Sequence, residues 1–196
     1  MTTPLSQTAL EQLFHNARSH SHWQQRPVSN ETLHQLFDLL KLCPTSANCA
    51  PARFLFLKTE EAKQKLRPFL MEGNVDKTMA APVCVIVAQD MQFYQHLPRL
   101  FPHADAKSWF EGNDAAIQAT AARNSTLQGA YLIMAARSLG LDCGPMSGFD
   151  NAGLDAEFFA DGRCKSNFLI NLGYGEAGKL FPRSPRFAFD EVCQIL

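Results

Sequence analysis

Two segments at opposite ends of the sequence carry side chains that could bind a phosphorylated ligand. Arg18, Ser19 and His20 stand together near the start, and Arg183 and Arg186 stand near the end. A guanidinium presents a fixed fork of N–H donors, so arginine can hold a phosphate with paired hydrogen bonds. If the fold brings both segments together, they predict a phosphate site. The alternative is that they are ordinary solvated surface charges.

Two further segments of small residues offer polar groups that a purely structural chain would not need. PTSANCAPARF, over 44–54, interrupts an apolar helical pattern and contains Ser46 and Asn48. In GPMSGFD, Gly144 and Gly148 allow the backbone to approach a ligand closely and to direct N–H groups at it. Such a loop suits the polar edge of a planar heterocycle, although two ordinary turns would have the same sequence.

Several common catalytic motifs are absent from the sequence. There is no G-x-G-x-x-G after a strand and no G-x-x-x-x-G-K-S/T, so neither a Rossmann site nor a P-loop is predicted. Ser147 has glycine on one side only, unlike the G-x-S-x-G of many hydrolases. Six cysteines lack C-x-x-C spacing and six histidines lack H-E-x-x-H, so we predict no metal site. We interpret the cysteines as buried apolar side chains; the alternative is a reactive thiol.

The composition predicts one globular domain over residues 1–196. Apolar residues make up 46% of the chain, charged residues make up 19%, and the formal net charge is −1. A chain of this length can bury a full core. Its near-neutral charge gives no field that would attract nucleic acid or an anionic membrane. The N-terminus shows no signal-peptide pattern and no segment is apolar enough to span a membrane, so we expect a cytoplasmic protein.

Apolar periodicity predicts the helices that must position these groups. Residues 8–18 and 31–43 place apolar side chains at helical spacing, and 72–81 predicts a turn and a short helix. A long helix from Asp114 to about Leu139 is expected to be the central helix of the core, with Asn113 as its cap.

Continuous apolar runs predict buried strands at 53–58, 82–88 and 165–175. Residues 144–150 are predicted to form a loop. The aromatic-rich segment 92–113 contains two prolines and has weak periodicity, so it is either a lid or pocket wall or an irregular packed excursion. Strands interleaved with helices favour a layered domain of mixed topology.

Taken in order, these segments resemble the FMN-dependent nitroreductase family over nearly the whole chain. An R-R-S-x-R-x-F-like segment is matched from Ala17 to Trp23, and P-S-x-x-N-x-Q-P-W is matched from Pro44 to Ala52. The remaining matches are N-x-x-K at Asn74 and Lys77, the loop Pro145 to Gly148, and the closing pair Arg183 and Arg186. Five motifs in the expected order make the resemblance specific.

The resemblance implies an α+β fold with three layers, α-β-α, around a mixed, mainly antiparallel sheet. It also implies an intertwined homodimer with two FMN sites at the interface, where the 44–48 loop comes from one subunit and the arginines from the other. The apolar end FAFDEVCQIL is consistent with docking on a partner, and equally with a last element packed on its own core.

The resemblance also implies a cofactor site in which arginines and a serine hold the FMN phosphate and polar loop residues hold the ribityl chain and the ring. The residues carried over are Arg18, Ser19, His20, Pro44, Thr45, Ser46, Asn48, Asn74, Lys77, Pro145, Met146, Ser147, Gly148, Arg183 and Arg186. Backbone N–H groups at Ser147 and Gly148 are expected to stabilise charge near N5 and O4 of the flavin. Ser21 stands where many members have a basic residue, which leaves Lys77 or Arg18 to supply positive charge near N1. No catalytic side chain and no metal are implied.

Within the family, the segments are most similar to the subgroup that contains the malonic semialdehyde reductase of the Rut pyrimidine-utilisation pathway. That similarity implies ping-pong hydride transfer from NADH or NADPH, through N5 of FMN, to malonic semialdehyde, which gives 3-hydroxypropionate. Two alternatives stay open: a broad nitro or quinone reductase, and a flavin-binding module without turnover.

Overall fold

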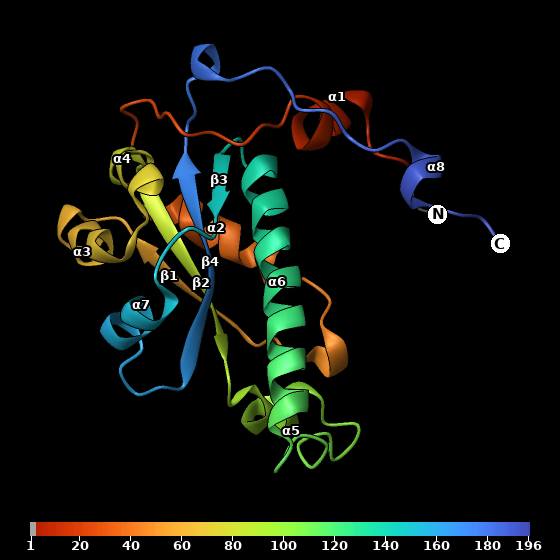
Figure 1. Ribbon diagram of the computed structural model, residues 1–196. Coiled ribbons are helices and arrows are strands. Elements are labelled where there is room, and N and C mark those ends of the chain that lie inside the picture. The colour runs from red at the N-terminus through yellow and green to blue at the C-terminus, as the bar shows by residue number, and fades with distance from the viewer. Residues whose placement is uncertain (1–2) are drawn as a thin grey trace.

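The computed structural model describes residues 3–196 and places a four-stranded sheet between two layers of helices (Figure 1). The strands are β1 (Ala52–Leu57), β2 (Val83–Asp90), β3 (Asp142–Met146) and β4 (Cys164–Gly173), in the order β1-β2-β4-β3. All three neighbouring pairs are antiparallel, and parallel pairing occurs at an isolated bridge between Ser19 and Cys143. The expected three-layer α+β fold is confirmed.

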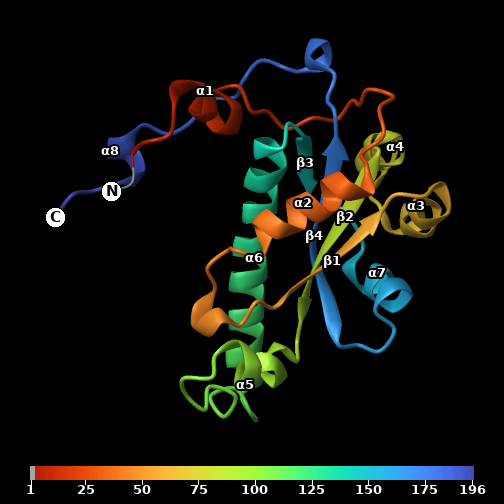
Figure 2. The ribbon, with the colours of Figure 1, turned by 180° about the vertical axis from the view of Figure 1, so that it is seen from behind.

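Helices cover both faces of the sheet (Figures 1 and 2). One face carries α2 (Asn30–Leu40) and the long α6 (Asp114–Ser138); the other carries α3 (Glu60–Leu66), α4 (Glu72–Ala80) and α7 (Asn151–Phe158). The short helices are α1 (Gln7–Leu10), α5 (Leu97–Leu100) and α8 (Phe189–Val192). Among residues 3–196, no helix has both the length and the apolarity needed to cross a membrane.

Strand β2 explains why the sheet needs both helical layers. Its side chains alternate between faces, as in any strand. Val85 and Val87 pack into the cluster that contains Leu132 of α6, whereas Cys84 and Ile86 pack into the cluster on the α3 and α7 side. Every residue of β2 except Gln89 is buried, which explains the nearly continuous apolar run in its sequence.

Polar residues before the helices set where the helices begin. The Asn113 side chain accepts a hydrogen bond from the Ala116 N–H at 3.1 Å, so α6 starts at the predicted cap. The Thr59 hydroxyl accepts from the Ala62 N–H at 3.2 Å and starts α3 in the same way.

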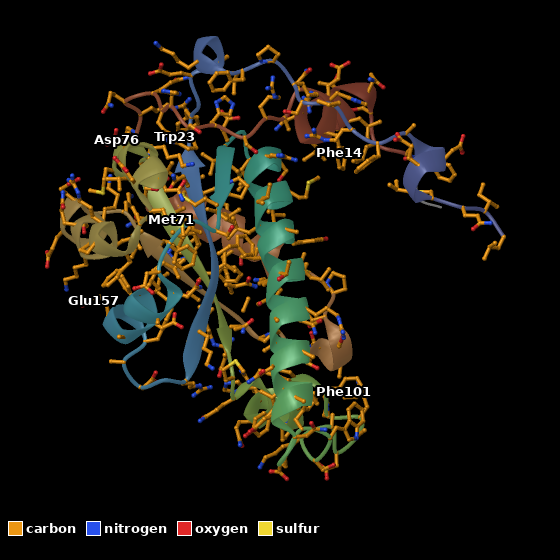
Figure 3. All side chains as sticks on the ribbon, viewed as in Figure 1. Phe14, Trp23, Met71, Asp76, Phe101 and Glu157 are labelled. Atoms are coloured by element: carbon orange, nitrogen blue, oxygen red, sulfur yellow. The ribbon has the colours of Figure 1, made fainter. Side chains whose placement is uncertain are left out.

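Two predicted elements differ from the structure. The 144–150 loop begins as strand β3, because Asp142–Met146 pairs with the end of β4. The predicted 8–18 helix is short α1 followed by a π-helical turn, Glu11–His15, that stops at Asn16. Phe14, one of the apolar residues at this spacing, is 52% exposed (Figure 3).

Residues 181–196 extend away from the body of the domain (Figures 1 and 2). The C-terminal segment runs beside α1 and ends far from the sheet in both views (Figures 1 and 2). Every residue from 181 to 196 is exposed, including Phe181 at 84%, Phe187 at 75% and Ile195 at 86%. Of the two alternatives for this end, packing on the core of the same chain does not occur in the structure.

The 92–113 segment is a packed excursion that starts with the 3-10 turn Phe93–His96 and α5. Phe93 and Leu97 are fully buried in a small cluster that also contains Cys49. The excursion thus rests on the segment that follows the PTSAN loop.

Candidate functional site

A cavity of about 270 Å³ lies where the beginning and the end of the folded chain meet. It is lined by Arg18, Ser19, Ser21, His22, Lys179, Leu180, Phe181, Pro182, Arg183, Ser184 and Arg186. The structure therefore brings together the two basic segments that the sequence analysis singled out. His22 and Lys179 were missed, because His22 stands at an unspecified position of the Ala17–Trp23 match and Lys179 lies outside every matched motif.

Reciprocal hydrogen bonds explain why the two basic segments meet. Arg18 Nη2 donates to the Phe181 carbonyl at 2.5 Å. In return, Arg183 Nη2 donates to the carbonyls of His15 at 2.7 Å and Ala17 at 3.1 Å. Each arginine thus fixes the backbone of the other segment and keeps its remaining N–H donors for a ligand.

The charge of this cavity favours an anion. Three arginines and Lys179 line it, and no aspartate or glutamate does. A cavity whose charged side chains are all positive attracts a phosphate group and can hold it through charge-assisted hydrogen bonds. The donor set therefore fits the phosphate of FMN.

A second cavity has a volume of about 470 Å³. Ser21 and His22 line both cavities. The other lining residues are Trp23, Gly73, Asp76, Lys77, Ala80 and Glu176. Figure 3 shows Trp23 and Asp76 at the same end of the molecule, beside α4. Asp76 and Glu176 carried no motif signal, so the sequence analysis did not propose them.

The predicted Lys77 lines this second cavity. Its carbonyl accepts a hydrogen bond from the Trp23 indole at 3.0 Å, which fixes α4 against the segment after Arg18. Within residues 3–196, its ammonium group makes no ion pair and no hydrogen bond. Lys77 can therefore supply positive charge to a ligand.

The predicted 145–148 loop lies against the N-terminal part of α4. Asn74 Nδ2 donates to the Gly148 carbonyl at 2.7 Å, and the Met71 N–H donates to the same carbonyl at 3.1 Å. A Cβ at position 148 would lie 2.5 Å from Asn74 Nδ2, so a larger residue there would displace the Asn74 amide. Pro145 and Ser147 are exposed, and Met146 is half-buried. The loop thus presents its backbone to the surface beside Asn74.

His20 occupies a different place from the one expected. Its side chain is only 6% exposed, and its Nε2 atom lies 3.4 Å from Asp142 Oδ1. A Cβ at Gly175 would lie within van der Waals overlap of the ring, at 1.9 Å from Nδ1. Since the ring is packed inside the fold, His20 lines neither cavity.

The predicted PTSAN residues lie apart from both cavities. Ser46–Asn48 form a 3-10 turn, η2, beside the lower half of α6, whereas Trp23 lies at the upper end of the molecule (Figures 1 and 3). Pro44 and Thr45 precede this turn and line neither cavity either. One chain therefore does not assemble all the predicted cofactor contacts in one place.

Cys49, Cys84 and Cys143 are buried and are poor nucleophiles, whereas Cys193 is exposed, unlike the buried side chain that was expected. Burial raises the pKa of Cys84 and Cys143 to about 12 and that of Cys49 to about 11. These thiols stay protonated near neutral pH, and the thiolate is the reactive form.

The fold and the matched motifs define the class of this protein. The sequence model of the nitroreductase family matches residues 15–174, and the chain belongs to that family. A protein of Burkholderia lata, provisionally named an NADH dehydrogenase/NAD(P)H nitroreductase, is 65% identical over 193 residues, which cover 98% of this chain and 99% of the relative.

Solved structures confirm the fold. A nitroreductase-like protein of Bacillus subtilis superimposes with a TM-score of 0.89 at 21% identity, covering 97% of this chain and 100% of the other. A provisionally named nitroreductase of Exiguobacterium sibiricum, solved in complex with FMN, superimposes with a TM-score of 0.85 at 21% identity and full coverage of both chains.

Proposed function

We propose that this protein is an FMN-dependent oxidoreductase that takes hydride from NADH or NADPH and passes it to a second small molecule, and that residues 1–196 form one FMN-binding domain. The observation that carries the proposal is the acid-free cavity in which Arg18, Arg183 and Arg186 meet. Membership of the nitroreductase family supports it, as does the FMN bound in the Exiguobacterium structure. The name of the Burkholderia relative supports the nicotinamide donor.

The side chains around the two cavities have distinct parts in this proposal. Arg18, Ser19 and Arg186 bind the phosphate. Lys77 places positive charge beside the ring, where negative charge develops when the flavin is reduced. The exposed Ser147 N–H and the Gly148 N–H donate to the polar edge of the ring. FMN supplies the chemistry, which is hydride transfer at N5.

For the acceptor, we propose malonic semialdehyde, reduced to 3-hydroxypropionate. The support is the similarity of four segments to the subgroup that contains the malonic semialdehyde reductase of the Rut pathway. These segments are PTSANCAPARF, LFPHADAKSWF, LGLDCGPMSGFD and KSNFLINLGYG. A broad nitro reductase is the second candidate, favoured by the name of the relative that is 65% identical. Rates on malonic semialdehyde and on a nitroaromatic, compared at equal enzyme concentration, distinguish the two.

We further propose that the working form is a homodimer in the cytoplasm, where NADH and NADPH are available. Two observations support the dimer: residues 181–196 expose large apolar side chains, and the 44–48 loop is separated from the cavity that its motif should complete. A second copy would cover the exposed apolar side chains of residues 181–196. It would also bring its own 44–48 loop to the cavity. Light scattering at a series of dilutions, with the flavin content measured in parallel, tests this arrangement, because dimer and FMN occupancy should fall together.

An anaerobic visible absorption spectrum, recorded before and after adding NADH or NADPH, tests the proposed function. Flavin bands that bleach support it. A colourless protein that takes up no FMN overturns it, and flavin bands that neither nicotinamide changes would favour a binding module without turnover.

A further inference from the structure

The loop after Thr45 has an unusual backbone. Ala47, Asn48 and Ala50 all adopt positive φ angles, of 48°, 49° and 37°. Residues with a Cβ disfavour this left-handed region, and three of them within four positions are rarely found. Such a segment persists only when its surroundings hold it, and it is often found at functional sites.

A buried side chain of α6 holds the start of this loop. Asn124 is fully buried, and its Oδ1 accepts a hydrogen bond from the Ser46 N–H at 2.9 Å. Its Nδ2 donates to the Thr120 carbonyl at 2.8 Å. A backbone N–H can only donate and a carbonyl can only accept, so the two contacts together define which atom of the amide faces the loop.

Further hydrogen bonds hold the rest of the loop. The Ala50 N–H donates to the Thr45 hydroxyl at 3.1 Å, and Asn48 Nδ2 donates to the Leu100 carbonyl of α5 at 2.8 Å. Behind the loop, the Ala52 N–H donates to Gln128 Oε1 on α6 at 2.9 Å. Of these supports, Asn124 is the one that joins the start of the strained turn to the core.

A helix core does not need an asparagine at this position. Leucine has a higher helix propensity and would bury no polar group. The Asn124 amide is useful where a backbone group, here the Ser46 N–H, must be held in one place. A loop that is already fixed loses less conformational entropy when a ligand binds to it.

We propose that Asn124 is a positioning residue for the flavin site: through the Ser46 N–H it fixes the 44–50 loop in the conformation that receives FMN. The inference rests on the proposed function and deepens it, since the predicted FMN contacts of that loop are Pro44, Thr45, Ser46 and Asn48. Asn124 itself touches no ligand in this arrangement and acts through the backbone of Ser46.

The dissociation constant of FMN, measured by flavin fluorescence on titration of the apoprotein, tests this role. Asn124→Leu should weaken binding by about tenfold or more while circular dichroism shows a folded protein. Asn124→Asp is the complementary variant, because its carboxyl group can still accept the hydrogen bond from the Ser46 N–H. Its affinity for FMN should therefore lie closer to that of the wild type than to that of Asn124→Leu.

Ser125→Ala is the matched control. Ser125 is also fully buried on α6, but its hydroxyl bonds to the Ala122 carbonyl and to Gln89, not to the loop. This variant should lose some stability and keep the wild-type affinity for FMN. Wild-type affinity in Asn124→Leu, or an equal loss in Ser125→Ala, would overturn the positioning role.

Hydrogen exchange at the Ser46 amide separates this inference from the proposed function, because it needs no flavin. If the wild-type protein takes up no FMN, the proposed function fails regardless of Asn124. Slow exchange at Ser46 that becomes fast in Asn124→Leu, and not in Ser125→Ala, supports the role of Asn124 in holding the loop. Exchange that is equal in all three proteins overturns it.

Discussion

Arg163 holds the fully buried carboxylate of Asp90 through two hydrogen bonds, from Nε to Oδ1 at 2.9 Å and from Nη2 to Oδ2 at 2.7 Å. Arg53 Nη2 donates to the same Oδ2 at 2.5 Å. Asp90 ends β2, Arg53 lies in β1, and Arg163 immediately precedes β4. The ion cluster therefore joins three strands next to the start of the 92–113 segment.

Replacing Asp90 should destabilise the domain in a pH-dependent way. Burial alone would raise the pKa of Asp90, but hydrogen bonds from Arg163 and the Gln92 N–H and the charges of both arginines outweigh burial, and the pKa lies below its usual value. The folded state thus binds a proton less readily than the unfolded chain. The stabilisation is present above about pH 4 and is lost as the pH falls through the lower folded pKa.

We expect Asp90→Asn to lower the free energy of unfolding by about 3 kcal/mol near neutral pH, because two arginines lose their buried partner. Urea titrations at neutral pH and at about pH 3 measure both effects. A variant that remains as stable as the wild type, or that shows the same loss on acidification, would contradict this account of the cluster.

His96 adds a second pH effect at the same place. Its Nε2 lies 2.9 Å from Arg163 Nη2, and since the guanidinium can only donate, the neutral imidazole accepts there. Partial burial, followed by the charge of Arg53, outweighs the attraction of Asp90 and lowers the pKa of His96. The contribution of neutral His96 to stability should therefore be fully present above about pH 6.5. It should be lost as the pH falls through the lower pKa of the folded state.

His96→Gln should remove this decline, because the glutamine oxygen accepts a hydrogen bond without titrating. Thermal unfolding midpoints between about pH 7 and pH 5 are the measurement. A wild-type midpoint that does not change over this range would rule out the expected linkage, and an unchanged slope in the variant would assign the decline to another group.

Arg186→Ala should weaken FMN binding by about tenfold, the loss expected for one charge-assisted hydrogen bond. Arg186 is the best arginine to test, because it donates only to the nearby carbonyls of Ser184 and Pro185 and does not join the two segments as Arg18 and Arg183 do. Fluorescence titration with FMN gives the dissociation constant.

Arg26→Ala is the control for the loss of positive charge. Arg26 is exposed and stacks on the Tyr174 ring at 3.6 Å from its centroid, outside both cavities of the candidate site. The Arg26→Ala variant should keep the wild-type affinity for FMN. An Arg186→Ala variant that binds FMN as tightly as Arg26→Ala does would remove Arg186 from the phosphate site.

Gly148→Ala should disrupt the contact between the 145–148 loop and α4. The added Cβ would lie 2.5 Å from Asn74 Nδ2 and 3.3 Å from Met71 Sδ, so Asn74 must move and lose its bond to the Gly148 carbonyl. Overpacking of this kind costs about 1–3 kcal/mol. Both the urea midpoint and the FMN affinity should fall.

Gly178→Ala is the matched substitution, because a Cβ at Gly178 meets nothing within 4 Å. Its urea midpoint should stay close to that of the wild type. If both alanine variants behave alike, the close approach at Gly148 has no energetic consequence.

Much of the secondary structure could be predicted from local patterns. The β-branched run of β2 and the helical spacing and Asn113 cap of α6 identify these elements, because burial and capping depend on residues near in sequence. Strand β3 was missed: its glycine and proline are typical of a loop, and only pairing with β4 makes Asp142–Met146 a strand.

The sequence by itself determined the layered α+β class, the family and the kinds of side chain available for binding a phosphate. Only the tertiary structure decided that Arg18 and Arg183 line one cavity, that His20 is packed inside, and that the PTSAN loop lies apart from that cavity within one chain. The physical reason is that periodicity reports which face of an element is buried. Which distant segments meet depends on strand order and on hydrogen bonds such as those of Arg18 and Arg183, which no local pattern encodes.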